Sequence, residues 1–220
     1  MASASPDLTL DELRISLAPA LARAAAFDGW SAQGVASAAD ELGVDRDVAA
    51  YAFKGGSMDM IAAWIANVDA RMVAALPADA LATMSIRERI RALVLFRLDA
   101  LAGHEESLRR ALAIMAMPQN AARALKLGWH SADLMWRLAG DVSTDYNHYS
   151  KRTILAGIYA ATLTIFASDE SDDKAETKAF LDRRIDGVMR FEKAKAKLLR
   201  KPEDRFSVAR FLGRLRYPAN

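Results

Sequence analysis

The sequence predicts an all-α fold, a helical bundle with a short three-helix unit before it and an amphipathic helix after it. The composition is 52% hydrophobic with only 11 Gly and 6 Pro. It favours long helices, because the abundant Ala, Leu, Arg and Met are strong helix formers. Capping signals and apolar residues at helical spacing recur, and no segment alternates as a strand would. Cysteine is absent, which excludes disulfides, thiolate metal sites and a cysteine nucleophile.

The first helix is predicted to begin at a capping box formed by Thr9 and Glu12. Leu13 and Leu17 follow at helical spacing and mark its apolar face. Pro19 lies inside this helix and is expected to kink or shorten it, because proline lacks the N–H that an interior position needs. The residues before Thr9 are expected to form a flexible tail, 1–8.

Two shorter helices are predicted next. Ser31 caps the first of them, which stops at Gly43, and Asp45 caps the second, which ends near Phe53. An aromatic pair, Tyr51 and Phe53, closes the unit. This order resembles the N-terminal helix-turn-helix domain of TetR-type repressors, where a tyrosine and a phenylalanine two residues apart also end the recognition helix.

This three-helix unit, residues 9–57, is poorly suited to DNA. Its recognition helix begins Asp45-Arg46-Asp47 and continues with small residues, and residues 1–58 hold eight acids against four bases. A protein that reads a duplex needs several Lys and Arg side chains to neutralise phosphates. We therefore predict a degenerate helix-turn-helix that binds no nucleic acid. A TetR-type transcriptional regulator with an apolar ligand pocket is the alternative.

The helical bundle is predicted over residues 58–201. A glycine pair breaks the chain before its first helix, 58–76, and Pro77 ends that helix. A second capping box opens the next helix at Ser85. Further helices are predicted at about 105–116, 119–139, 145–167 and 173–199.

The segment from residue 129 to residue 159 carries the most specific pattern in the chain. It contains Asp133-Leu-Met-Trp136, Ala139-Gly-Asp141, Ser143-Thr-Asp145, Asn147, Tyr149, Lys151-Arg152 and Leu155-Ala-Gly-Ile-Tyr159. It closely resembles the signature of the ubiquinone-biosynthesis lipid-binding accessory family, the ninth Coq protein of mitochondria and its alphaproteobacterial relatives. That family has a TetR-like fold, which agrees with the helix-turn-helix pattern.

The resemblance implies a protein that is not an enzyme. Members of the family bind polyprenyl lipids, including ubiquinone precursors, in an apolar cavity, and they form homodimers. They attach to membranes by a C-terminal amphipathic helix and hand substrate to the di-iron demethoxyubiquinone hydroxylase. Carried over by position, the hydroxylase-binding patch is Asp133, Trp136 and Arg137. The chain departs from the family at Arg137, where the animal proteins tend to have an aromatic residue.

Two features of this segment have alternative interpretations. Trp136 beside an acid is typical of an interface hot spot, whereas a Trp at helical spacing is commonly part of the core. Gly157 lies inside a predicted helix, where Gly costs about 1 kcal/mol relative to Ala. With its neighbouring alanines it forms a small-residue stripe that suits the close approach of another helix, from a dimer partner or from the same bundle.

Large apolar residues on the presumed inner faces are the candidates for the lipid cavity. Methionine in particular adapts to irregular apolar ligands. Ordinary core packing is the alternative for each of them. The candidates are Met115, Met135, Leu138, Leu155, Ile158, Tyr159, Phe180 and Met189.

After Pro202, residues 203–217 are predicted to form an amphipathic helix. Residues 189–220 hold ten bases against three acids. A basic amphipathic helix suits binding at a membrane surface, and packing back on the bundle is the alternative. The residues expected at the membrane are Val208, Arg210, Phe211, Leu212, Arg214 and Leu215.

No pattern for catalysis, metal or cofactor binding is recognisable, so we expect no cofactor. A di-iron bundle needs two carboxylate-x-x-His units, and only Asp145 and His148 fit one. An enzyme built from scattered residues is a further alternative. No apolar run is long enough to cross a bilayer, and the N-terminal residues are acidic where a leader would be basic. We expect a bacterial cytoplasmic protein, peripheral on the inner membrane, or a protein on the matrix face of mitochondria.

Overall fold

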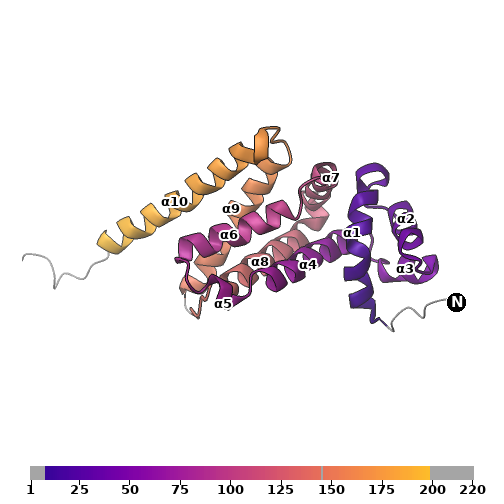
Figure 1. Ribbon diagram of the computed structural model, residues 1–220, viewed down its shortest axis with the longest axis horizontal. Helices are drawn as coiled ribbons and strands as arrows, with labels where there is room; N and C mark the ends of the chain where they lie inside the picture. The colour runs from indigo at the N-terminus through magenta and orange to yellow at the C-terminus, as the bar shows by residue number, and fades with distance from the viewer. Residues whose placement is uncertain (1–7, 145, 199–220) are drawn as a thin grey trace, which may run out of the picture. The chain divides into compact units, whose positions relative to one another are not determined.

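The computed structural model describes residues 8–144 and 146–198, and it folds the described chain into helices without strands, as predicted (Figure 1). The chain divides into two compact units, residues up to 182 and residues from 183 onward. The described part of the second unit is the continuation of one helix.

The helices agree closely with those predicted, apart from three short ones that the sequence pattern did not indicate (α5, η1 and η2). In chain order they are α1 (Leu10–Asp28), α2 (Ala32–Leu42), α3 (Arg46–Ala52), α4 (Ser57–Ala75), α5 (Ala78–Leu81), α6 (Ile86–Asp99), α7 (Glu105–Met115), η1 (Pro118–Asn120), α8 (Ala121–Leu138), α9 (Tyr146–Phe166), η2 (Asp172–Lys174) and α10 (Ala175–Leu198).

The predicted caps set the ends of several helices. The Thr9 hydroxyl accepts from the Glu12 backbone N at 3.3 Å, while the Glu12 carboxylate accepts from the Thr9 backbone N at 2.9 Å. Ser85 and Glu88 form the second capping box in the same way. Gly43 ends α2 with φ of 65°, in the left-handed region that glycine adopts without a steric cost.

Pro19 does not shorten α1, which was one of the two effects predicted for it. The helix runs unbroken through it from Leu10 to Asp28. Proline has no N–H to donate to the carbonyl four residues earlier, which here belongs to Ile15. The side-chain amide of Asn67, on α4, donates to that carbonyl at 3.2 Å and replaces the missing bond. A neighbouring helix therefore stabilises the interior proline.

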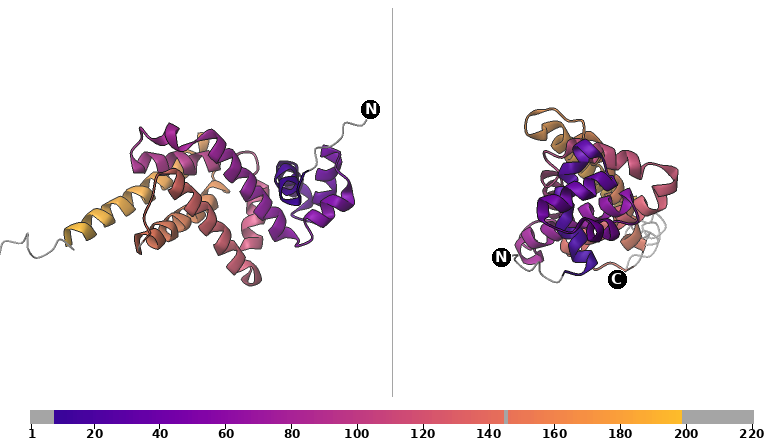
Figure 2. Two further views of the ribbon diagram at one scale, coloured as in Figure 1. Left: turned by 90° about the horizontal axis from the view of Figure 1, so that it is seen from below. Right: turned by 90° about the vertical axis from the view of Figure 1, so that its right-hand side faces the viewer.

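The three-helix unit α1–α3 is fixed to the first helices of the bundle. Figures 1 and 2 show it gathered at one end of the bundle, where α1 packs against α4 and α7. The Trp30 indole N–H donates to the Ser107 carbonyl at 3.0 Å, and the Ser57 hydroxyl donates to the Trp30 carbonyl at 2.6 Å. The Trp30 ring also lies 5.3 Å from that of Trp64. The short connection between α1 and α2 is thus part of the core.

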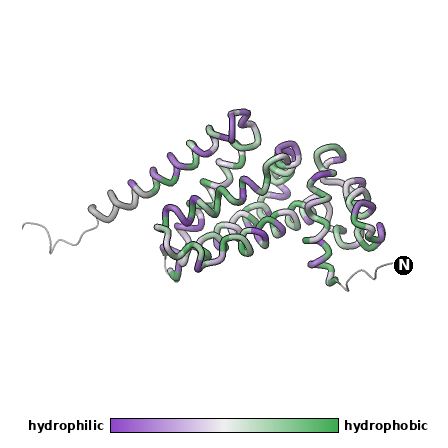
Figure 3. Tube along the Cα trace, viewed as in Figure 1, coloured by the Kyte–Doolittle hydropathy of each residue, from purple (hydrophilic) through white to green (hydrophobic). Residues whose placement is uncertain are grey.

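The bundle is formed by α4, α6, α7, α8 and α9. Among these helices α8 packs most extensively on α9, and α4 contacts both α6 and α8. Figure 3 shows hydrophobic residues interspersed with hydrophilic ones along these helices, and a hydrophilic turn at η2 between α9 and α10. No helix of the described residues is long and apolar enough to cross a membrane.

Candidate functional site

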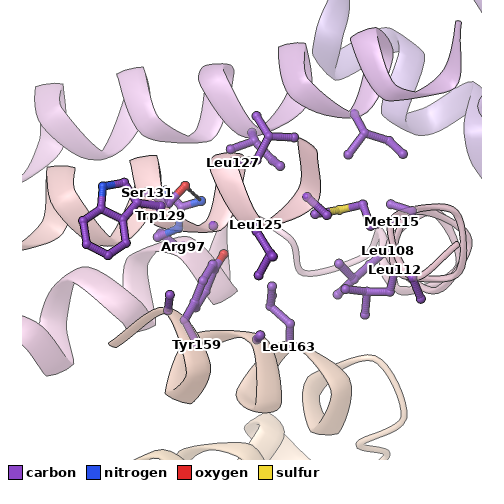
Figure 4. Close-up of a pocket in the computed structure, with 18 of the residues that line it drawn as sticks. Arg97, Leu108, Leu112, Met115, Leu125, Leu127, Trp129, Ser131, Tyr159 and Leu163 are labelled. Atoms are coloured by element: carbon purple, nitrogen blue, oxygen red, sulfur yellow. Dashed lines mark hydrogen bonds between the residues drawn. The ribbon is translucent and has the colours of Figure 1, made fainter. Parts of the chain in front are cut away.

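An apolar cavity of about 730 Å³ lies among the bundle helices, within residues up to 182 (Figure 4). Its walls come from α4, the end of α6, α7, α8 and α9. Large apolar side chains form the wall on the α4 and α7 side, among them Ile61, Val68, Leu108, Leu112 and Met115. Cavities of about 300–1,000 Å³ are the usual size for binding small molecules.

Small residues on α8 and α9 create the empty space. Ala124 and Gly128 on α8, and Ala156, Gly157 and Ala160 on α9, line the cavity at helical spacing. A Cβ atom built on Gly128 or Gly157 would meet no neighbouring group within 4 Å in the described part of the chain. The stripe around Gly157 therefore faces the cavity, not a closely packed helix of the same bundle. Its role in a dimer stays a prediction.

The cavity is open to the surface. Several of its lining residues are exposed, including Ala121 and Leu125 on α8 and Gly157 and Ala160 on α9. Leu125 is the largest of these four, and 75% of it is exposed. An exposed leucine beside the cavity gives its opening an apolar rim, which suits the entry of an apolar molecule.

One end of the cavity is polar and is lined by Arg97, Ser131 and Tyr159. Asp69, which pairs with Arg97, does not line the cavity. The side chains of Arg97 and Asp69 are only 2% and 7% exposed and form an ion pair. Arg97 Nη2 donates to the Ser131 hydroxyl at 3.1 Å, and Arg97 Cζ lies 4.9 Å from the centre of the Tyr159 ring. Among the described residues, Arg97 Nε is the buried side-chain nitrogen that has no hydrogen-bond partner.

The predicted lipid-binding residues are divided between the cavity and the packed core. Met115 and Tyr159 line the cavity. Met135 and Leu155 are buried, and Leu138, Ile158 and Phe180 are half-buried, but these five are not among the lining residues. The side chain of Met189 lies outside those that the structure describes. Sequence reasoning did not identify Arg97, although an arginine on the apolar face of a predicted helix is a recognisable signal.

The predicted partner-binding residues belong to an ion-pair cluster that joins α8 to α9. Arg152 is buried and donates through Nε to Asp133 at 2.6 Å and through Nη1 to Asp141 at 2.9 Å. Arg137, which is exposed, pairs with Asp133 at 2.7 Å. The half-buried Trp136 donates its indole N–H to the Lys151 carbonyl at 3.0 Å. Asp133 and Trp136 therefore have structural contacts, and Arg137 is the most accessible of the three.

Asp141 is the most strongly perturbed acid of this cluster. Burial alone would raise the pKa of its carboxyl group, but hydrogen bonds from Lys151, Ser143 and Arg152 outweigh this effect and lower the pKa from 3.8 to about 2. Lys151 Nζ donates to it at 2.7 Å and the Ser143 hydroxyl at 2.8 Å. The turn between α8 and α9 is thus held by a permanently charged carboxylate at neutral pH.

The recognition helix α3 offers little positive charge to a phosphate backbone. Arg46 is paired with Asp40, and Lys54 lies 4.8 Å from the Tyr51 ring centre. The Asp45 carboxylate caps the helix by accepting from two backbone N–H groups. These contacts are consistent with a helix-turn-helix whose role is structural.

The six residues expected at the membrane, from Val208 to Leu215, lie outside the described residues. In the described part of the chain, no group of three or more His, Asp or Glu side chains is arranged to hold a metal ion.

The profile of the COQ9 family matches residues 121–192, which include α8, α9 and the cavity wall that they form. The mitochondrial ubiquinone biosynthesis protein COQ9 of Rattus norvegicus is 35% identical over 168 residues, which are 73% of this chain and 54% of that protein. Its Homo sapiens counterpart is 33% identical and covers 73% and 52%. The chain spans about half the length of the curated relatives it matches.

A solved structure shares the fold. The TetR transcriptional regulator of Nitrosomonas europaea superposes with a TM-score of 0.62 at 22% identity, and covers 79% of this chain and 95% of the regulator. This likeness confirms the predicted TetR-like helical fold.

Proposed function

The chain belongs to the COQ9 family through the family domain at residues 121–192, and on this premise we propose that it serves ubiquinone biosynthesis by binding a polyprenyl quinone precursor in its apolar cavity. One observation carries the proposal. The two helices of the family domain that precede α10 supply thirteen of the twenty-four residues that line the cavity. The segment shared with the family therefore supplies more than half of the cavity lining.

The chemistry of the lining supports a polyprenyl ligand. Alanine, leucine, isoleucine and methionine side chains offer no directional contacts, and burial of each ligand methylene contributes about 0.8 kcal/mol. The irregular walls, with Met115 among them, suit a branched and flexible chain. The exposed rim at Leu125 gives such a chain an entrance that need not cross a polar surface.

We assign the protein an accessory role, in which it presents the quinone ring to the di-iron demethoxyubiquinone hydroxylase. Support comes from α8, which lines the cavity with one face and carries Asp133, Trp136 and Arg137 near its C-terminal end. Trp129 on the cavity lies one turn before Asp133. A partner that docks on this end of α8 would therefore lie close to the ligand.

The pathway role is tested by deleting the gene in the source organism and measuring its quinones by mass spectrometry. Loss of ubiquinone with accumulation of the demethoxy precursor is expected. Complementation should succeed with Ala161→Phe and fail with Ala160→Phe, because both alanines are exposed on α9 but only Ala160 lines the cavity. Normal ubiquinone in the deletion strain would refute the pathway role, and equal rescue by both variants would refute the role of the cavity.

The hydroxylase contact is tested by a charge reversal on α8. Arg137→Glu should reduce co-purification with the hydroxylase, whereas Lys126→Glu, an exposed control on the same helix, should leave it unchanged. Thermal unfolding of both variants shows whether the loss of the Asp133 ion pair has changed stability instead. Equal co-purification of the two variants with the wild-type amount would remove this surface from the proposal.

We further propose a homodimer that lies peripherally on a membrane through residues 203–217, on the bacterial inner membrane or the matrix face of mitochondria. Deletion of residues 203–220 should abolish binding to anionic liposomes and leave the helical circular dichroism of the bundle intact. Sedimentation of the purified protein measures its oligomeric state, which should be a dimer. Specific binding to a promoter duplex at physiological salt would instead favour the TetR-type regulator. Residues 45–52, with Asp45 and Asp47 against Arg46, oppose that outcome.

A further inference from the structure

We propose that the first two turns of α8, residues 121–127, form a lid on the cavity. An ion pair between Arg123 and Asp59 latches this lid to α4, and the lid swings outward at Gly128 when a ligand enters or leaves. The passage of a ligand rests on the proposed lipid-binding function, whereas the movement of the lid follows from the contacts of the lid itself. Three observations support it: the low burial of the lid, its single latch, and the bending points at its two ends.

The lid is the least buried part of the cavity wall. Of residues 112–130, all of which the structure describes, none is buried. The same helix is packed differently after Gly128, where Ser131, Ala132 and Met135 are buried. Segments with few buried contacts open locally at a low cost while the rest of the fold stays closed. The cavity wall is therefore expected to open first at the lid.

Movement of the lid would change the opening of the cavity. Four of the seven lid residues line the cavity, and they are Ala121, Ala124, Leu125 and Leu127 (Figure 4). Ala121 and Leu125 are also exposed, so they belong to the rim. An outward swing of this segment widens the opening for a bulky ligand, and a return swing covers the ligand again.

The latch is an ion pair whose acid is held in place from a second side. Arg123 Nη2 donates to Oδ1 of Asp59, in the first turn of α4. The other oxygen, Oδ2, accepts from the backbone N–H of Gly55 at 2.9 Å. A Cβ atom on Gly55 would collide with this carboxylate, so only glycine at position 55 leaves room for it. In the described part of the chain, this pair is the lid's one ion pair to another helix.

Both ends of the lid are suited to bending. Gly128 follows the lid within α8, and glycine favours the helix less than alanine does. The short helix η1 precedes the lid, and its first residue, Pro118, has no N–H to donate. Bending at these two points moves the lid and leaves the ion-pair cluster between α8 and α9 in place.

Hydrogen exchange of the full chain without ligand, read by mass spectrometry, measures the opening of the lid. Arg123→Ala should speed exchange in residues 121–127 about twofold to fivefold, which corresponds to the loss of a partly exposed ion pair. Lys126→Ala removes the other charge of the lid and is the matched control, which should leave exchange unchanged. Gly55→Ala should act like Arg123→Ala, because the added Cβ displaces the Asp59 carboxylate. The combination of the two should be no faster than either alone.

A substitution at the bending point should have the opposite effect. Gly128→Ala should slow exchange of the lid about threefold to fivefold, because alanine stabilises the helix at this point. Gly157→Ala adds the same methyl group to the cavity wall, but on α9, and is the matched control. A Cβ at either position meets no group within 4 Å, so neither variant is expected to strain the fold.

The passage of a ligand is tested by tying the lid down. The chain has no cysteine, so Asp59→Cys with Arg123→Cys provides two thiols and no others. A bismaleimide that contains a cleavable disulfide links them. Uptake of a geranylgeranyl-substituted 1,4-benzoquinone from phosphatidylcholine liposomes should be at least tenfold slower in the linked protein. It should recover after the linker is reduced and the reductant is removed, so the protein is its own control.

The outcomes separate the lid from the lipid-binding function. Exchange in Arg123→Ala that equals exchange in Lys126→Ala would overturn the lid, as would equal uptake by the linked and released protein. If the exchange results hold but no quinone is taken up in either state, the movement of the lid stands and the lipid-binding function fails. If the double cysteine variant does not fold, the exchange measurements decide the matter.

Discussion

Replacement of Asp69 by alanine should destabilise the protein more than any substitution of a surface acid. Asp69 lies on α4 and pairs with Arg97 on α6, and the two side chains are 7% and 2% exposed. Removal of the carboxylate leaves the buried guanidinium of Arg97 without the negative charge that neutralises it. Breaking a buried pair in this way costs about 3–5 kcal/mol. Since domains are stable by about 5–15 kcal/mol, this is a large part of the total.

Urea denaturation followed by circular dichroism measures the effect. The midpoint should fall with little change in slope, because the surface exposed on unfolding stays the same. Asp40→Ala is the matched control, since Asp40 forms an ion pair with Arg46 in which both side chains are well exposed. Exposed pairs contribute little to stability, so its midpoint should remain near that of the wild type.

A second variant shows that the cost comes from the orphaned charge. Asp69→Leu combined with Arg97→Met removes both charges and should recover most of the loss, since apolar residues of similar size often replace a buried pair without penalty. Two results would refute a cost that comes from the orphaned charge: a loss of stability in Asp69→Ala no larger than that in Asp40→Ala, or a double variant as unstable as Asp69→Ala alone. Either result would mean that the buried charge of Arg97 does not depend on Asp69 for its compensation.

Three further predictions concern stability. Gly157→Ala should raise the free energy of unfolding by about 0.5–1 kcal/mol, because the added Cβ meets no neighbour within 4 Å and alanine is the better helix former; a lower midpoint in urea would contradict the open space at this position. Asp173→Gly should stabilise by about 1 kcal/mol, because Asp173 has φ of 53° in the left-handed region; no gain in thermal unfolding would show that the residue is not strained. Asp141→Asn should destabilise the protein near neutral pH. The difference in the free energy of unfolding between this variant and the wild type should close as the pH falls from about 4 to about 2, because the pKa of Asp141 in the folded state lies below the ordinary 3.8. A difference that stays constant across this window in urea titrations would contradict the lowered pKa.

The ends of helices could be predicted from sequence because caps are local. The side chains of Thr9, Ser31, Asp45 and Ser85 accept from backbone N–H groups no more than three residues away, so the pattern contains the whole interaction. Pro19 shows the limit. Its place inside an unbroken α1 depends on a hydrogen bond from another helix, and no local pattern carries that information.

The cavity was harder to predict, because it is a space that small side chains leave empty and not a set of contacts between large ones. Large apolar residues were chosen as its candidates, and two of these, Met135 and Leu155, are buried without lining it. The space exists where facing helices carry alanine and glycine, as at Gly128 and Gly157. Small residues at helical spacing also suit tight helix packing, so sequence alone does not distinguish a cavity from a close contact. The distance between the two helices distinguishes a cavity from a close contact, and that distance is set by the tertiary structure.

The most direct test of the central claim is the amount of polyprenyl quinone that the purified protein takes up from liposomes, measured by mass spectrometry after reisolation. The wild type and Ala161→Phe should each hold about one quinone per chain, whereas Ala160→Phe should hold almost none, because only its phenyl ring enters the cavity. An equal amount of quinone in Ala160→Phe and Ala161→Phe, or none in the wild type, would contradict the account.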